Sequence, residues 1–586
     1  MGVGFVSGDE FPSEGKRESL SASAAAVTTA RLRPELFTGQ TARALSRALV
    51  AAVLFVVVAG GFGFRAANLG AEGLSEDELN KLRTVQEYRT HGLTPTNGEH
   101  PMLMKALLTA SVVASEAWNG TSIARSNASL QVPLESALRL PGALLGALSA
   151  LLIFLIVSEL FGVPAALTAA ALWAFGPAAI GFNRIAKEDS FFLFFFLLAN
   201  VFWLRGQRVA ESGERRPEAY YWAAAASFGA MLASKYIPHL FAISASYYWI
   251  FQGAPSTRWR LGKRKWLAFF AVMGAAFVLC NLTILLPGTW REMRTFAGEH
   301  RIGHDSYEFM GALYRNQMTL WLKGSPWYFY YAFIAFKLPL AVVAAFVVGL
   351  PQILRRKLGD GRYFVIFWLF FWFFPFTLLG GKFTRYFTFA LPVVIITASL
   401  GVQYVARRVS ALFTSDAARG YAHALVVVLV VLSSAYASAS AAPHYRLYTN
   451  ALGGGQARAG SHFPHDEFYD ASTPGAAALI AARARPGSAV ASETPELFDF
   501  YARRAGRDDL RHVSLSDPEA VGELSAGDHV VVARGRRYFS NEAATAALES
   551  TAQPAATLQL GGVPSARIFA LDEPSAAALR ETAARR

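Results

Sequence analysis

Residues 141–161 read PGALLGALSALLIFLIVSELF, an apolar run in which Glu159 is the only ionisable side chain. A helix of about 20 such residues spans the hydrocarbon core of a bilayer. Similar runs recur on both sides of it, and about eleven candidate spans are found at 44–64, 141–161, 164–182, 190–204, 219–234, 237–251, 266–286, 327–350, 363–379, 386–405 and 421–442. The chain of 586 residues is 53% hydrophobic and 17% charged. The sequence therefore predicts a polytopic α-helical membrane protein.

The basic residues predict the orientation of these spans. They gather in alternate loops: Arg205, Arg208, Arg215 and Arg216; Arg258, Arg260, Lys263, Arg264 and Lys265; Arg355, Arg356, Lys357 and Arg362; Arg407, Arg408 and Arg419. Basic loops remain on the cytoplasmic side of a membrane. This pattern places a disordered tail (1–43) inside, a transmembrane domain at 44–442, and the loops 65–140 and 288–325 outside the plasma (inner) membrane. It also accounts for the net charge of +13, so nucleic acid is not an expected partner.

The composition after residue 442 is that of a water-exposed domain. Short β-rich runs at 488–491, 512–515, 530–532 and 567–571 alternate with helix-like stretches at 476–485 and 543–550. A small extracytoplasmic α/β domain is expected at 443–586. The run Gly453 to Gly455 does not lie between a strand and a helix, so it indicates a flexible turn and not a phosphate-binding loop. The single cysteine, Cys280, excludes a disulfide framework.

The first outer loop carries a group of ionisable residues close to the membrane. Asp77 and Glu78 lie shortly beyond the first span, and Glu99, His100 and Lys105 come later in the same loop. One interpretation is structural, because Glu78 stands three residues after a serine, as in a helix capping box. The other is catalytic, because an acid, an imidazole and an amine meet at one membrane face.

A second acidic site lies in the short outer loop before residue 190. Arg184 and Glu188 have the spacing of an ion pair within a helix. Asp189 borders an apolar run, where a carboxylate is costly without a partner or a function.

Outer cations complete the pattern. Lys235 has the alternative of a side chain that only reaches the membrane surface. Lys382 and Arg385 are three residues apart, and we expect a helical turn to place both on one face toward a lipid phosphate. Carboxylates that face cations suit group transfer from a lipid phosphate, in which an acid accepts a proton and the cations neutralise the leaving group.

The order of these residues resembles the protein O-mannosyltransferase superfamily, which includes the bacterial aminoarabinose transferases and has the GT-C fold. The resemblance extends to about residue 448, and its carriers are Glu76-Asp77-Glu78, His100-Pro101 with Lys105, Arg139-Leu140-Pro141-Gly142, Arg184 with Asp189, and Lys382 with Arg385-Tyr386. It implies a glycosyltransferase that uses a polyprenyl-phosphate-linked sugar and inverts the anomeric carbon.

By this resemblance the site residues take specific roles. The expected catalytic residues are Asp77, the base, with Glu78 and Asp189; the expected donor-phosphate ligands are Lys382, Arg385, Lys235 and Arg184; the expected substrate contacts are Glu99, His100, Lys105 and Tyr386. The motif Glu99-His100-Pro101-Met102 departs from the second proline of many relatives, and the sugar-repeat domain of the eukaryotic enzymes is missing. Protein O-mannosylation is therefore not implied, and the acceptor is a protein, a lipid or a glycan.

Two alternatives stay open. His462, His465 and Asp466 are weak candidates for a divalent cation, because imidazole and carboxylate suit zinc but their spacing is irregular. A transporter or lipid flippase would also explain the spans, although such proteins place ionisable residues near the membrane midplane, and here they gather at one face.

Overall fold

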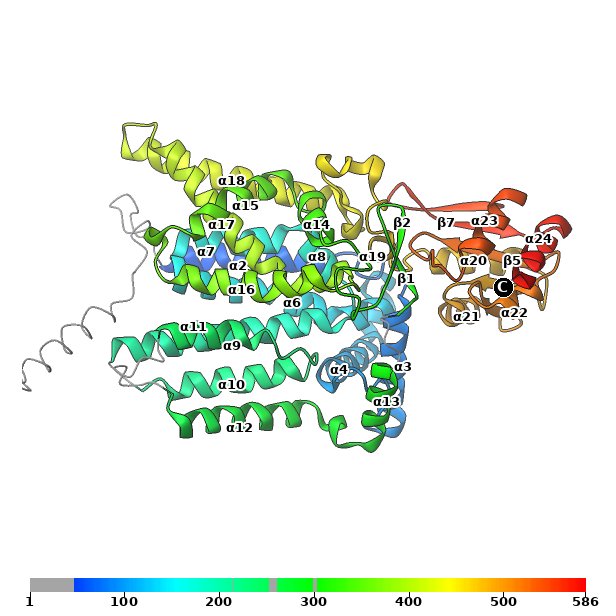
Figure 1. Cartoon of the computed structure of the whole chain (residues 1–586), viewed down its shortest axis with the longest axis horizontal. Helices are drawn as coiled ribbons and strands as arrows, with labels where there is room; N and C mark the ends of the chain where they lie inside the picture. The colour runs from blue at the N-terminus through cyan, green and yellow to red at the C-terminus, as the bar shows by residue number, and fades with distance from the viewer. Residues whose placement is uncertain (1–46, 214–215, 252–260, 299–302, 586) are drawn as a thin grey trace, which may run out of the picture.

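The computed structural model describes residues 47–213, 216–251, 261–298 and 303–585. The expected tail at 1–43 and the basic residues Arg215, Arg258 and Arg260 lie outside the described residues. A long bundle of helices stands beside a small α/β unit, and the loop elements gather at the end of the bundle that faces this unit (Figure 1).

Every predicted apolar stretch coincides with a helix or with two consecutive helical segments. The bundle helices are α2 (Arg47–Ala66), α6 (Leu134–Phe161), α7 (Val163–Phe175), α8 (Pro177–Asn183), α9 (Glu188–Ser212), α10 (Glu218–Leu232), α11 (Phe241–Phe251), α12 (Lys263–Cys280), α14 (Phe329–Lys337), α15 (Leu340–Ile353), α16 (Gly361–Leu378), α17 (Leu391–Ser410) and α18 (Asp416–Ala441). Short 3-10 turns are η3 (Leu282–Leu285), η4 (Arg356–Leu358) and η5 (Thr384–Phe389).

Among the described residues, five helices are long and apolar enough to cross a membrane, namely α2, α6, α9, α16 and α18. The pair α7 and α8 adds a sixth if it forms one span, bent by 59°. The bend follows from Gly176 and Pro177, because proline cannot continue the hydrogen-bond ladder of the preceding helix. The chain is thus an integral membrane protein by its helices, and the number of about eleven spans stays a prediction.

Helix α6 differs from the sequence expectation in a way that affects the site. Its predicted start was Pro141, but it begins at Leu134 and Pro141 lies inside it. The two additional turns carry Arg139, which is buried at the end of the bundle.

The loop elements at this end are helical and, in one place, a hairpin. They are α3 (Glu76–His91), α4 (Met102–Asn119), α5 (Ser122–Ser126), η2 (Ala128–Leu130), α13 (Pro287–Gly298), and the antiparallel strands β1 (Ser306–Phe309) and β2 (Ala312–Arg315). Helix α3 opens with a capping box in which Ser75 accepts from the Glu78 amide and Glu78 accepts from the Ser75 amide. The cap fixes the first turn, Glu76 to Glu78, at the end of the bundle.

The α/β unit contains a five-stranded sheet of order β4-β3-β5-β7-β6. The strands are β3 (Ala489–Ser492), β4 (Arg511–Ser514), β5 (His529–Ala533), β6 (Ala556–Leu560) and β7 (Val563–Ala570), with helices α20 (Thr473–Arg483), α21 (Pro495–Arg504), α22 (Pro518–Gly522), α23 (Glu542–Thr551) and α24 (Glu573–Ala584). β3 runs parallel to β4 and β5, whereas β7 is antiparallel to β5 and β6. Strands occur at all four predicted runs, and β6 is the strand that was not predicted.

The chain between α18 and the sheet packs against the bundle. It forms η6 (Tyr445–Leu447), η7 (Ala451–Gly453), η8 (Gly455–Arg458) and α19 (Pro464–Phe468). Asn450 donates to the carbonyls of Ala335 and Leu338, and Lys337 pairs with Glu467 at 2.6 Å. The same segment also packs against the sheet, because Leu447, Ala459 and Phe468 share a hydrophobic cluster with Leu560 of β6 and Val563 of β7. The expected boundary at residue 443 stays a prediction.

Candidate active site

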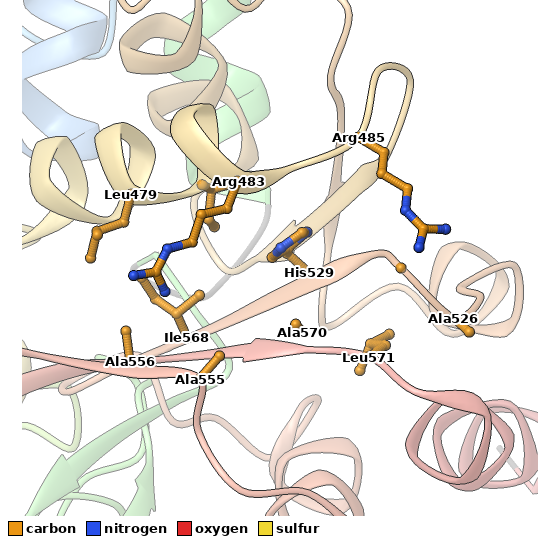
Figure 2. Close-up of a pocket in the computed structure, with 12 residues that line it drawn as sticks. Leu479, Arg483, Arg485, Ala526, His529, Ala555, Ala556, Ile568, Ala570 and Leu571 are labelled. Carbon is orange, nitrogen blue, oxygen red and sulfur yellow. The ribbon is translucent and has the colours of Figure 1, made fainter.

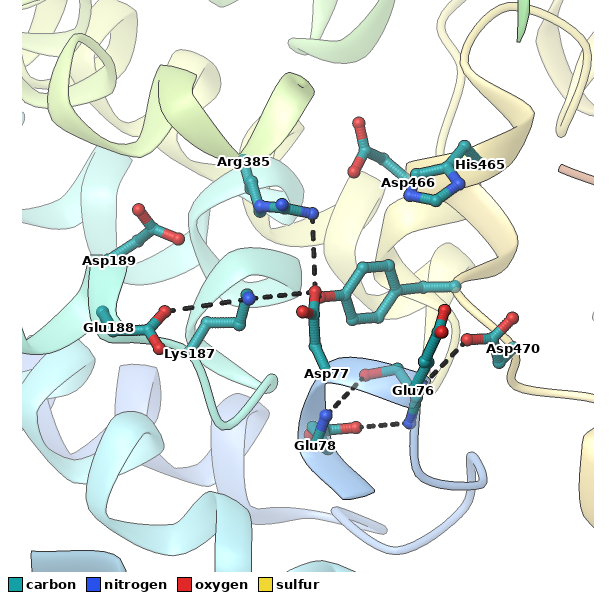
Figure 3. A network of polar contacts seen from close by, with 12 residues as sticks. Glu76, Asp77, Glu78, Lys187, Glu188, Asp189, Arg385, His465, Asp466 and Asp470 are labelled. Carbon is teal, nitrogen blue, oxygen red and sulfur yellow. Dashed lines mark hydrogen bonds and ion pairs between the residues drawn. The ribbon is translucent and has the colours of Figure 1, made fainter. Parts of the chain in front are cut away.

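Asp77 is the centre of the polar network at this end of the bundle (Figure 3). Its Oδ2 accepts a hydrogen bond from the Tyr469 hydroxyl at 2.7 Å and lies 2.9 Å from Lys187 Nζ. Arg385 Nη1 lies 3.6 Å from the same oxygen. All three contacts of Asp77 with described residues are made through Oδ2, and the side chain is 36% exposed. Oδ1 thus forms no hydrogen bond or ion pair with the described residues.

The surrounding cations keep Asp77 ionised. Burial would raise the pKa of this carboxyl, but the charges of Lys187 and Arg385 outweigh it and hold the pKa well below its usual range. Burial and the neighbouring carboxylate raise the pKa of Tyr469 well above 10, so its hydroxyl remains a donor. Asp77 is therefore a fixed anion whose orientation is set by a tyrosine.

Behind Lys187 lies a second carboxylate, Glu188, which is fully buried. It contacts Lys81 Nζ at 2.7 Å, His100 Nδ1 at 3.4 Å and Lys187 Nζ at 3.8 Å. Burial and three neighbouring lysines hold the pKa of His100 well below 6.5, although Glu188 acts in the opposite direction. His100 is thus a neutral imidazole at physiological pH.

Asp189 pairs with Lys235 next to this cluster. Lys235 Nζ donates to Asp189 Oδ1 at 2.5 Å and lies over the rings of Tyr386 and Phe389, at 5.0 and 5.4 Å from their centroids. A cation that contacts one buried carboxylate and two aromatic faces is held in place by all three. The predicted residues Asp77, His100, Asp189, Lys235, Arg385 and Tyr386 thus lie in one region.

Residues of the α/β side extend the network toward Asp77. Arg536 donates to Asp470 through Nε at 2.6 Å and to Glu76 through Nη1 at 3.0 Å, while the Glu76 amide donates to Asp470 at 3.1 Å. His304 stacks on Tyr538, with ring centroids 4.0 Å apart, and its Nε2 lies 3.4 Å from Glu76. The residue before Asp77 is therefore bonded to the α/β unit.

Two predicted site residues have structural roles. Glu78 accepts from Arg139 Nε and Nη2 at 2.8 and 2.7 Å and from the amides of Ser75 and Ala186, each at 2.9 Å. Four donors occupy its carboxylate, so the structural interpretation of Glu78 is confirmed, and its catalytic role stays a prediction. Lys382 is buried and its ammonium donates to the carbonyls of Ser325 and Leu379.

The expected clamp of Lys382 with Arg385 needs correction for this reason. Lys382 precedes the 3-10 turn η5, so no helical turn carries both residues. Its donors are used by backbone carbonyls, and burial lowers its pKa to about 8. Of the two expected clamp residues, only Arg385 contacts Asp77.

Arg184 and Lys105 also donate hydrogen bonds to backbone carbonyls. Arg184 donates to the carbonyls of Arg65, Ala67 and Asn68 at 2.7–2.8 Å, which ties the loop before α9 to the end of α2. The expected pair of Arg184 with Glu188 is therefore not formed.

Lys105 anchors the first outer loop. It donates to the carbonyls of Thr96 and Asn97 at 3.2 and 2.8 Å. Asn97 in turn bridges the Lys81 ammonium and the Glu99 carboxylate. Glu99 thus takes part in loop structure, one residue before His100.

The three candidate metal ligands each form hydrogen bonds with different partners. His462 contacts the Gly453 carbonyl at 2.7 Å and His465 the Gly535 carbonyl at 3.3 Å. Asp466 accepts from the Tyr307 hydroxyl and the Thr384 amide, both at 2.7 Å. Across the part of the chain that the structure describes, no group of three His, Cys, Asp or Glu side chains is arranged to hold a metal ion.

Lys81, Lys187, Glu188 and Tyr469 were not predicted as site residues. Lys81 could have been found, because it lies one helical turn after Asp77 on α3. Lys187 and Glu188 are adjacent to Asp189, which was singled out. Tyr469 has no local signal, since it lies 392 residues from Asp77 in a 3-10-rich segment.

A separate pocket of about 440 Å³ lies in the α/β unit between α20 and the sheet (Figure 2). Arg483, Arg485 and His529 line it together with alanine, leucine and isoleucine side chains. Its lining contains no carboxylate and no Ser, Thr, Cys, Tyr or Lys side chain. This pocket therefore lacks the groups for group transfer, in contrast to the Asp77 region.

Residues 123–284 match the family model described as "Dolichyl-phosphate-mannose-protein mannosyltransferase". This segment of the chain is similar to that family. The expected resemblance is confirmed there, and the matched segment includes Lys187, Glu188, Asp189 and Lys235. Asp77 and Arg385 lie outside it. No curated protein matches the chain in sequence.

Among solved structures, the chain is similar to ArnT from Cupriavidus metallidurans bound to undecaprenyl phosphate, with 13% identity, 89% of this chain and 98% of that chain covered, and a TM-score of 0.47. It is also similar to the oligosaccharyltransferase AglB from Archaeoglobus fulgidus, with 11% identity, coverages of 83% and 69%, and a TM-score of 0.49. The Pmt1-Pmt2 complex of S. cerevisiae follows with 16% identity, coverages of 46% and 36%, and a TM-score of 0.29. All three TM-scores are below 0.5.

Proposed function

We propose that the chain is a membrane glycosyltransferase that moves a sugar from a polyprenyl-phosphate donor to an acceptor hydroxyl. The observation that carries this proposal is Asp77, a partly exposed carboxylate ringed by cations at the end of an apolar helix bundle. The mannosyltransferase match of residues 123–284 supports the same donor class. The expected orientation places the reaction on the extracytoplasmic side of the inner membrane.

The proposed reaction is a single displacement. Asp77 Oδ1 accepts the proton of the acceptor hydroxyl, and the acceptor oxygen forms a bond to the anomeric carbon from the side opposite the phosphate. The bond between that carbon and the phosphate oxygen breaks, and its electron pair leaves with the polyprenyl phosphate. Arg385 and Lys187 stabilise the negative charge that develops there, and Lys235 is the next cation available. One displacement inverts the anomeric carbon.

The acceptor is a protein, a lipid or a glycan hydroxyl. A divalent cation is not needed for this scheme, because the cations of the chain itself face Asp77.

Sugar transfer from a labelled polyprenyl-phosphate sugar in membranes tests the proposal. Asp77→Asn keeps the hydrogen-bond shape but removes the base, and we expect transfer to fall about 10²- to 10⁴-fold. Glu496→Gln, which removes an exposed carboxylate paired with Arg83, is the matched control and should keep full activity. Undiminished transfer by Asp77→Asn would contradict the base assignment. Solute uptake by proteoliposomes without any sugar transfer would favour the transporter alternative.

A further inference from the structure

Arg385 is a mostly buried guanidinium whose hydrogen-bonding capacity is unused within the described residues. Its side chain is 13% exposed, it lies 4.1 Å from the centroid of the Phe383 ring, and it forms its ion pair with Asp77 at 3.6 Å, beyond hydrogen-bond length. A guanidinium carries five N–H donors in a planar fork that fits phosphate oxygens. In the described structure, Arg385 donates none of them to protein groups. These donors are available to an anionic ligand at the site.

Asp77 occupies the place at which such an anion would contact Arg385. It contacts Arg385 and Lys187 through one oxygen, Oδ2, so a phosphate that binds both cations competes with this oxygen. The third group that contacts Oδ2 is the Tyr469 hydroxyl, which is neutral. The phosphate therefore attracts it less strongly than it attracts the two cations, and we expect its hydrogen bond to Asp77 to remain. Phosphate binding would thus remove two of the three contacts and leave the one that orients the carboxylate.

We infer that Asp77 is an internal counter-ion in the donor-free protein, and that the donor phosphate displaces it from Arg385 and Lys187 and so releases it to act as the base. The inference rests on the proposed function and deepens it. Tyr469, from the segment after the last bundle helix, is then the positioning residue that holds Oδ2 while Oδ1 faces the acceptor. The loss of two cationic contacts also raises the proton affinity of Asp77 when the acceptor hydroxyl has to be deprotonated.

The inference predicts that removing the base improves donor-side binding. Undecaprenyl phosphate should bind Asp77→Asn about tenfold or more tightly than wild type, because the competing anion is gone. Glu76→Gln is the matched control: it removes the neighbouring charge, which is paired with Arg536 and not with Arg385 or Lys187. Its affinity should equal that of wild type. Undecaprenol, which has no phosphate, should bind all three proteins equally.

Two further variants identify the cause of any gain. Adding Arg385→Gln to Asp77→Asn should abolish the improvement, because the released cation is then missing. Tyr469→Phe should keep the wild-type affinity for undecaprenyl phosphate but lower the transfer rate about tenfold. Asp77→Ser serves as a second charge-removing variant if Asp77→Asn does not yield folded protein.

The affinity for undecaprenyl phosphate, measured in detergent micelles, tests the counter-ion role independently of sugar transfer. Equal affinities of wild type, Asp77→Asn and Asp77→Ser would overturn the inference, and so would an equal gain in Glu76→Gln. If these variants lose transfer without any gain in affinity, the proposed glycosyltransferase function stands and the counter-ion role fails.

Discussion

Arg139→Met is expected to destabilise the fold by about 3–5 kcal/mol, the range for breaking a buried ion pair by removal of one partner. Arg139 and Glu78 are 4% and 1% exposed and share two hydrogen bonds of 2.8 and 2.7 Å. Methionine replaces much of the apolar stem, so most of the loss comes from the uncompensated Glu78 charge. Arg139 also donates to the carbonyls of Leu69, Glu72 and Gly73 at 2.6–3.2 Å, which places the estimate in the upper part of the range.

The assay is denaturant unfolding of the detergent-solubilised protein, followed by tryptophan fluorescence. The double variant Arg139→Met with Glu78→Gln should recover part of the stability, because the buried charge is removed as well. A loss below about 1 kcal/mol in Arg139→Met would refute the buried ion pair, since that is the range of exposed pairs.

Three further predictions concern pH and phosphate binding. Burial raises the pKa of Glu72, but the charges of Arg446 and His444 outweigh this effect and lower the pKa from 4.5 to about 2. A carboxyl whose pKa is lowered in the folded protein contributes stability that is present above pH 4.5 and is lost as the pH falls toward 2. Glu72→Gln should therefore cost about 3 kcal/mol at neutral pH, and the difference from wild type should shrink between pH 4.5 and 2 in unfolding measurements. Lys382→Met should leave the affinity for undecaprenyl phosphate unchanged in a binding titration, because the Lys382 ammonium donates its hydrogen bonds to backbone carbonyls. A large loss of affinity would instead support the expected phosphate clamp of Lys382 with Arg385. Lys235→Met should weaken this affinity about tenfold in the same titration through loss of a nearby cation, and an unchanged affinity would exclude Lys235 from the phosphate site.

Local sequence features were sufficient for much of the fold and for the central carboxylate. The apolar runs, the four strands and the acidic group around Asp77 in the first outer loop could be predicted from periodicity and charge, whereas the choice of Asp77 as the base came from the family resemblance. Strand β6 was missed because it is an edge strand with alternating exposure and weak apolar content. The start of α6 was missed because Pro141 was interpreted as a helix start, whereas the helix continues through it.

The roles of the individual cations could not be predicted, because they depend on contacts between distant parts of the chain. Lys382 and Arg385 are nearly adjacent in sequence, but one is bound by carbonyls and the other faces Asp77. Arg184 likewise binds the backbone at the end of α2, more than 100 residues earlier. Charge and spacing indicate that cations are present at a membrane face, and only the fold decides which of them have free donors.

The location of the phosphate in a complex with undecaprenyl phosphate tests the account most directly. We expect its oxygens within hydrogen-bond distance of Arg385 and Lys187, with the Asp77 carboxylate displaced from both but still bonded to Tyr469. A phosphate bound beside Lys382, or in the α/β pocket lined by Arg483 and His529, would contradict the account.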